Sequence, residues 1–182
     1  GLGARYQGIG INMVDAQSFD AVATAAARAG VPLISFNVDD ARTANARLAT
    51  VGQNMPEAGR KFGEAVASRI PEGSHVLLTM HDPGITALEE RAAGARAALT
   101  SHKLKWTSLI TGTDREQAVV KIKAALEADR SIRVVLGTGE ADTQAAGLAL
   151  ERHFADQGYV AGGVDTGGEI MRLVKHGTVL LT

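Results

Sequence analysis

Short apolar runs alternate with amphipathic stretches along nearly the whole sequence, and this alternation constrains the fold more than any other feature. The runs are rich in β-branched residues, which is typical of buried strands, while the amphipathic stretches carry a helical period. Strands and helices that alternate form parallel sheets, because each helix returns the chain to the starting edge of a sheet. We therefore predict an α/β fold of three-layer αβα type, with helices on both faces of parallel sheets.

The same pattern sets the boundaries of the expected elements. Strands are expected at residues 7–12, 31–36, 47–52, 75–80, 105–111, 132–137 and 159–164, and from 179 onward. Helices are expected at residues 18–29, 56–69, 86–99, 114–128, 142–156 and 168–176. The second and third strands are the only neighbours in this series without a helix between them.

The segment between those two strands, NVDDARTANA at residues 37–46, is polar and has no helical period. In the other connections a helix can pack the chain back onto the same sheet. We therefore expect the chain to leave one sheet over residues 38–46 and to enter another. On this interpretation, residues 1–37 belong to a first lobe, residues 38–52 form a hinge, and residues 53–182 form a second lobe.

Composition excludes several classes of function. The chain has a net charge of -1 with scattered Lys and Arg, so it lacks the basic face that nucleic acid requires. It has no cysteine, which excludes disulfides and thiolate metal sites, and its five histidines show no ligand spacing. We expect no metal and no cofactor. No apolar run approaches the roughly 20 residues that span a bilayer.

Enzymatic readings find no specific support in the sequence. There is no nucleophile elbow, and no pair of carboxylates has the helical spacing of an acid and a base. The glycine-rich stretch GTGEADT at residues 137–143 lacks the third glycine of a dinucleotide site and the Lys-Ser/Thr of a P-loop. We therefore expect a binding protein rather than an enzyme.

Polar residues follow most of the expected strands. In open α/β sheets, ligands bind beyond the carboxyl ends of the strands. Arg91 lies about one turn into a helix and could point its guanidinium toward the same edge. Carboxylates, amides and an Arg fork together suit a neutral ligand with many hydroxyl groups. The candidate ligand-binding residues that follow strands are Asn12, Asn37, Asp39, His81, Asp82, Gly139, Glu140, Asp142 and Asp165.

Each of these residues also has a purely structural interpretation. Asn37 and Asp39 can serve local turn chemistry after a strand. Arg91 follows two glutamates, so it can form a surface ion pair along its helix. Asp165 can cap the helix that follows it.

Several stretches resemble the periplasmic sugar-binding proteins of bacterial ABC transporters, of the ribose-binding type. The resemblance covers nearly the whole chain, and VGQNMPEAGR followed about 30 residues later by ALEERAAG is its most specific part. The stretches are VPLISFNVDD, ATVGQNMPEAGRKFGEAVA, GITALEERAAGARAAL, TDREQAVVKIKAALEA and GGVDTGGEIMRLVKHGT. The resemblance implies the type I periplasmic-binding-protein fold, with a nearly complete second lobe and a partial first lobe. It also implies that the sequence is cut at both ends.

The resemblance further implies a substrate-binding component of a sugar ABC transporter. Such a protein holds a monosaccharide or polyol in the cleft between two hinged lobes and presents it to a membrane permease in the periplasm. The family's sugar contacts correspond here to Asn37, Arg91, Gly139 and Asp165, with Asn12 lining the side of the first lobe. The alternative is the effector-binding core of a Lac-repressor-type transcription regulator, which shares the fold and the cleft.

The sequence departs from the ribose-binding pattern at two of these positions. Ribose-binding members carry Asp-Arg where this chain has Asn37-Val38, and Asn where it has Gly139. These differences argue against ribose itself. Because Gly139 has no side chain, we expect it to leave space beside the cleft, so that Glu140 or Asp142 supplies the contact instead.

Overall fold

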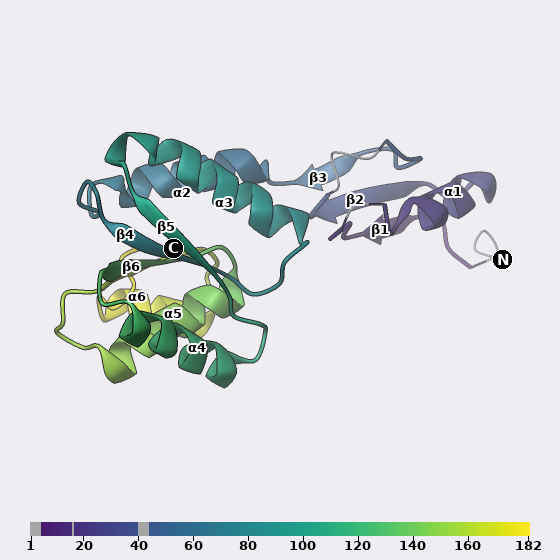
Figure 1. Ribbon diagram of the computed structural model, residues 1–182. Helices are drawn as coiled ribbons and strands as arrows, with labels where there is room; N and C mark the ends of the chain where they lie inside the picture. Colours follow the sequence, from purple (N-terminus) through teal and green to yellow (C-terminus); the bar gives the residue numbers. More distant parts are fainter. Residues whose placement is uncertain (1–4, 16, 40–43) are drawn as a thin grey trace. The chain divides into compact units, whose positions relative to one another are not determined.

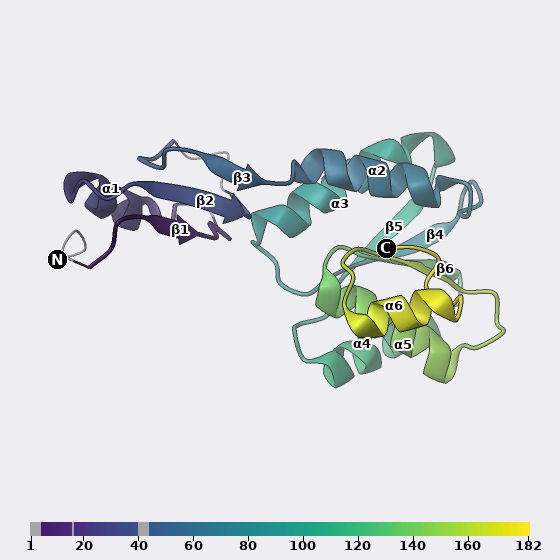
Figure 2. The same ribbon diagram turned by 180° about the vertical axis from the view of Figure 1, so that it is seen from behind.

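The computed structural model describes residues 5–15, 17–39 and 44–182. The chain forms two compact units, shown in Figures 1 and 2. The first unit comprises Gly1–Asn54 with Gly84–Ala87, and the second comprises Met55–Pro83 with Leu88–Thr182. Each unit is built around its own parallel sheet.

The first unit contains a three-stranded sheet in the order β1-β2-β3 and one helix. Its core consists of Met13, Ala23, Ala26 and Leu33, which join the helix to one face of the sheet. On the other face, Ile34, Phe36 and Val51 are exposed. The elements are β1 (Ile9–Ile11), α1 (Asp20–Arg28), β2 (Leu33–Asn37) and β3 (Thr50–Gly52).

The expectation that the chain changes sheet over residues 38–46 is wrong. β3 runs parallel to β2 in the same sheet, with Ser35 opposite Thr50 and Asn37 opposite Gly52. About a dozen residues suffice for a parallel crossover, so this connection returns the chain to its own sheet. The chain passes to the second sheet only after β3. Residues 40–43 of the expected hinge lie outside the described part.

The second unit contains a four-stranded parallel sheet in the order β5-β4-β6-β7. The strand expected from residue 179 is reduced to a single bridge between Ala161 and Val179, with a hydrogen bond of 2.8 Å from Leu180 N to Ala161 O. The elements are α2 (Met55–Ala67), β4 (His75–Met80), α3 (Thr86–Ala98), β5 (Lys105–Ile110), α4 (Arg115–Ala128), β6 (Ile132–Gly137), α5 (Glu140–His153), β7 (Val160–Gly162) and α6 (Gly168–Lys175), with a short 3-10 helix at Thr100–His102.

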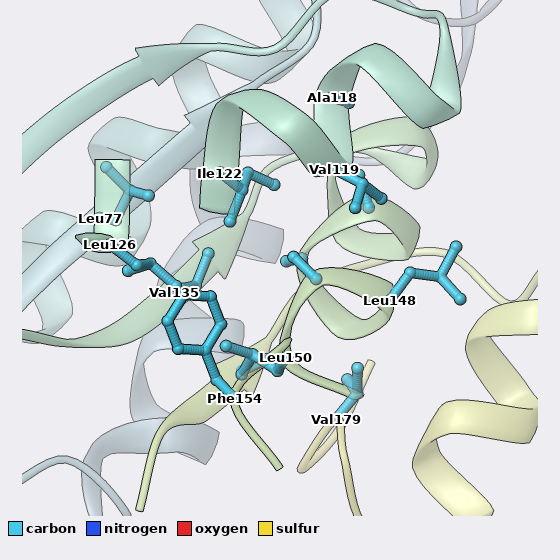
Figure 3. Packing of buried hydrophobic residues seen from close by; sticks show 14 of the residues in the cluster. Leu77, Ala118, Val119, Ile122, Leu126, Val135, Leu148, Leu150, Phe154 and Val179 are labelled. Carbon is cyan, nitrogen blue, oxygen red and sulfur yellow. The ribbon is translucent and has the colours of Figure 1, made fainter. Parts of the chain in front are cut away.

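Helices cover both faces of this sheet, which confirms the three-layer αβα architecture predicted from the sequence. Successive side chains of a strand point to opposite faces. Val76 and Leu78 of β4 pack in a cluster with residues of α2 and α3, whereas Leu77 packs with residues of α4 and α5. Figures 1 and 2 show α2 and α3 on one face and α4, α5 and α6 on the other. Figure 3 shows the cluster that contains Leu77. Leu77 and Val135 of the sheet belong to it together with Ile122 of α4.

Glycines allow α2 and α3 to pack with their backbones in close approach. A Cβ atom added to Gly59 would lie 2.1 Å from the carbonyl oxygen of Arg91, and one added to Gly94 would lie 2.1 Å from that of Pro56. Both glycines belong to the sequence stretches that carry the family resemblance. This close contact fixes the position of α3. It therefore also fixes the position of the Arg91 backbone, from which the side chain extends.

We predict that Gly94→Ala lowers the free energy of unfolding, although Gly→Ala inside a helix ordinarily raises it by about 0.5–1 kcal/mol. The new methyl group would collide with backbone, which cannot rotate away, and overpacking of this kind costs about 1–3 kcal/mol. Urea unfolding measures the change. Gly168→Ala is the control, because a Cβ atom there meets nothing within 4 Å. A more stable Gly94→Ala variant would contradict the close approach.

Candidate functional site

The strand order places a topological switch point at the carboxyl ends of β4 and β6. From β4 the chain crosses over through α3 to β5 on one side, and from β6 it crosses over through α5 to β7 on the other side. The loops that follow these two adjacent strands therefore diverge, and such a switch point is where ligands bind in open α/β sheets. His81 and Asp82 follow β4 here, and Thr138 and Gly139 follow β6.

A buried carboxylate, Asp142, ties the two loops together. It is fully buried and accepts hydrogen bonds from the backbone N–H groups of Thr138 at 2.6 Å and Gly139 at 3.1 Å. It also accepts from the hydroxyl of Thr79 at 3.2 Å and from Nδ1 of His81 at 2.9 Å. Asp142 lies in the first turn of α5, where negative charge is favoured by the helix dipole. The carboxylate thus holds the ends of β4 and β6 and the start of α5 in one arrangement.

The hydrogen bond that His81 donates to Asp142 raises the pKa of His81, and the nearby carboxylates of Asp82 and Asp165 act in the same direction. Burial of the imidazole opposes the shift. The His81 side chain is 18% exposed, so the ring is mostly packed but still reaches the surface. Since an ionised carboxylate only accepts hydrogen bonds, Nδ1 carries the hydrogen of this pair.

The imidazole of His81 fills the space above Gly139. A Cβ atom added to Gly139 would lie 2.6 Å from Cε1 of His81 and 3.0 Å from Cδ2 of Leu88. The expectation that Gly139 leaves open space beside the site is therefore wrong, because the ring occupies that space.

Arg91 is directed at the same loop. Its guanidinium donates from Nη1 to the carbonyl oxygen of Thr138, and Nη2 lies 3.4 Å from Sδ of Met55. Burial lowers the pKa of Arg91, while the carboxylates of Asp165 and Asp142 raise it. An Arg remains charged in proteins, so the site keeps a fixed positive charge. Arg91 thus binds the β6–α5 loop. The surface ion pair considered from the sequence does not account for this contact.

Three exposed carboxylates belong to the same edge of the second sheet: Asp82 after β4, Glu140 at the start of α5, and Asp165 after β7. Asp165 has a positive φ of 75°. The helix cap considered for it is not formed, because the N-cap of α6 is Gly167 and no side chain caps that end. Asp165 is exposed and follows the end of β7.

The three candidates in the first unit share one edge of the first sheet. Asn12 accepts a hydrogen bond of 3.4 Å from the backbone N–H of Val38. Asn37 is exposed and has a positive φ of 61°. Asp39 forms an ion pair with Arg47 at 3.0 Å, which favours a local role for this carboxylate.

Sequence reasoning missed the threonines that complete the site. The hydroxyl of Thr138 donates to the carbonyl oxygen of Thr79 at 3.0 Å, and Thr143 accepts from the backbone N–H of Val164 at 3.1 Å. All three threonines are buried. The available signal was Thr79 itself, a polar residue near the end of the apolar strand HVLLTM.

In residues 5–15, 17–39 and 44–182, no group of three or more His, Cys, Asp or Glu side chains is arranged to hold a metal ion. Within these same ranges, no helix has the length and apolar character needed to cross a membrane.

We predict that the stabilising effect of His81 depends on pH. Its pKa is raised in the folded protein above the ordinary value of about 6.5, so its contribution is fully present below about pH 6.5. The contribution is lost as the pH rises through the folded-state pKa. Urea unfolding should therefore show that His81→Gln destabilises more at about pH 5.5 than at about pH 8.5. His153→Gln, at an exposed position of α5, is the control. An equal effect at both pH values would contradict the pairing with Asp142.

Comparison with known proteins agrees with this architecture. A model of the periplasmic binding protein domain matches residues 2–182. The xylose/arabinose-binding protein XylF of Sulfolobus acidocaldarius is 23% identical over 154 residues, which cover 80% of this chain and 38% of that protein. The chain thus spans well under half the length of this curated relative.

Solved structures show the same fold. A periplasmic sugar-binding protein of an ABC sugar transporter from Legionella pneumophila matches with a TM-score of 0.89 at 20% identity, over 99% of this chain and 67% of that one. A solute-binding protein of Burkholderia graminis, in complex with D-arabinose, matches with a TM-score of 0.89 at 21% identity, over 98% of this chain and 63% of that one. The type I fold expected from the resemblance is confirmed, and the chain belongs to the periplasmic binding protein domain family.

Proposed function

We propose that this chain is part of the substrate-binding component of a sugar ABC transporter and binds a monosaccharide or polyol. The observation that carries the proposal is the group of polar side chains at the switch point of the second sheet. There the charge of Asp165 acts on both Arg91 and His81, and the charge of Asp82 acts on His81. Glu140 begins α5 at the same edge.

This set of groups suits neighbouring hydroxyls of a neutral sugar. Each hydroxyl offers one donor and two acceptor lone pairs. The guanidinium of Arg91 supplies donors in a rigid fork, and the carboxylate of Asp165 supplies acceptors. Because the site carries both positive and negative groups, a ligand without net charge can satisfy both kinds.

The relatives support the ligand class without selecting one sugar. Structures with a similar fold hold D-arabinose, D-fucose and D-allose, which are all monosaccharides. In the proposed protein, Asn12, Asn37 and Asp39 of the first unit remain candidate ligand contacts, and each unit corresponds to one lobe. The protein works outside the cytoplasm, without catalysis, nucleic acid or a cofactor, and delivers its ligand to a membrane permease.

The rival function is the effector-binding core of a transcription regulator. The family model and the similar structures are those of periplasmic binding proteins and transporter components, which favours the receptor. The polar group at the switch point could bind a sugar in either kind of protein. The ligand experiment that follows therefore tests the binding site and does not distinguish a receptor from a regulator.

We predict that Arg91→Ala and Asp165→Asn, each made in the complete gene product, weaken monosaccharide binding by about tenfold to hundredfold. Each removes a charged hydrogen-bonding group, which is worth about 1.5–3 kcal/mol. Isothermal titration against D-arabinose, D-fucose, D-allose and polyols measures the change.

Arg96→Ala is the matched control, because Arg96 lies on the same helix but contacts Ser108 at 2.8 Å and the ring of Trp106. Its affinity should equal that of the native protein. A folded native protein that binds no member of the panel would overturn the proposed function.

A further inference from the structure

The close packing of His81 on Gly139 raises the question of which side chain serves the carboxyl end of β6. Gly139 has an extended backbone, with φ of -149° and ψ of -179°, which any residue can adopt. Glycine is therefore required here by space and not by conformation. A Cβ atom would lie 2.6 Å and 2.8 Å from Cε1 and Nδ1 of His81. The imidazole that follows β4 thus occupies the place that a side chain from β6 would otherwise take.

Asp142 determines how this ring is presented. Its carboxylate is fully buried and already accepts four hydrogen bonds, so it is poorly placed to touch a ligand. Because Asp142 binds Nδ1 of His81, Nε2 is the ring nitrogen that remains available to a ligand. Nε2 lies on the opposite side of the ring, and among the described residues no side chain or backbone group forms a hydrogen bond with it.

We propose that His81 is a specificity-determining ligand contact, which binds one hydroxyl of the ligand through Nε2, and that Asp142 is its positioning residue. The proposal rests on the function proposed above and names a side chain that recognises one hydroxyl of the ligand. It also divides the two roles that sequence reasoning had assigned alike to His81 and Asp142.

The charge of the ring sets the polarity of the contact. A neutral His81, with its hydrogen on Nδ1, accepts a hydrogen bond at Nε2, whereas a protonated His81 donates one. A charged donor makes a hydrogen bond roughly twice as strong as a neutral one. The charged groups that act on the ring are Asp142 from α5, Asp82 from the β4–α3 loop and Asp165 after β7. The three carboxylates favour the protonated form, so affinity should fall as the pH rises through the pKa of His81.

The test measures binding of the best monosaccharide and of its singly deoxygenated analogues to the complete gene product. The variants are His81→Ala, Asp142→Asn and Gly139→Ala, with Gly168→Ala as a control in open space. We expect His81→Ala to weaken binding of the parent sugar about tenfold to hundredfold. One deoxy analogue should bind the native protein and His81→Ala equally, because it lacks the hydroxyl that His81 reads.

The positioning role has its own readouts. Asp142→Asn should move the pH profile of binding to lower pH, and ¹⁵N NMR should show that Nδ1 no longer carries the hydrogen alone. Gly139→Ala should weaken binding like His81→Ala, and the double variant should be no weaker than His81→Ala, since the displaced ring is then absent.

The outcomes separate the two proposals. If the folded native protein binds no sugar, the proposed function fails and this inference fails with it. If it binds a sugar but His81→Ala weakens the parent and every deoxy analogue by the same factor, His81 is structural and only the inference is overturned. An unchanged pH profile in Asp142→Asn would overturn the positioning role.

Discussion

The buried carboxylate of Asp142 is the interaction on which the site depends. One side chain accepts hydrogen bonds from the ends of two adjacent strands, from the first turn of α5 and from the imidazole of His81. A carboxylate is almost never fully buried unless it is paired, and here all of its partners lie at the carboxyl ends of β4 and β6. Loss of that group would remove the hydrogen bond that holds the ring of His81 and would leave the β6–α5 loop to Arg91 and the Thr138 hydroxyl.

The regular elements of the second unit could be predicted from sequence because their signals are local. The strands β4 at His75–Met80 and β6 at Ile132–Gly137 have the expected boundaries, since each is an apolar run ended by a polar or glycine-rich turn. The pairing of β3 with β2 could not be predicted in this way. It is a long-range contact between two strands, and no periodicity in the sequence records such a contact.

The site was predicted in outline and not in detail. The residues that follow the strands were identified because parallel strands end at one edge, and the structure brings His81, Asp82 and Asp165 to the same edge. The burial of Asp142 and the packing of His81 on Gly139 are visible only in the three-dimensional structure. In the sequence, a glycine that makes room for a ring from a distant residue looks the same as a glycine beside empty space.

The central claim is that a monosaccharide binds at the carboxyl edge of the second sheet. A crystal structure of the complete gene product with a bound monosaccharide tests it most directly. The account predicts sugar hydroxyls within hydrogen-bond distance of the Arg91 guanidinium, the Asp165 carboxylate and Nε2 of His81, with Asp142 beneath them and out of contact. A sugar bound elsewhere on the second unit, or one held directly by Asp142, would contradict it.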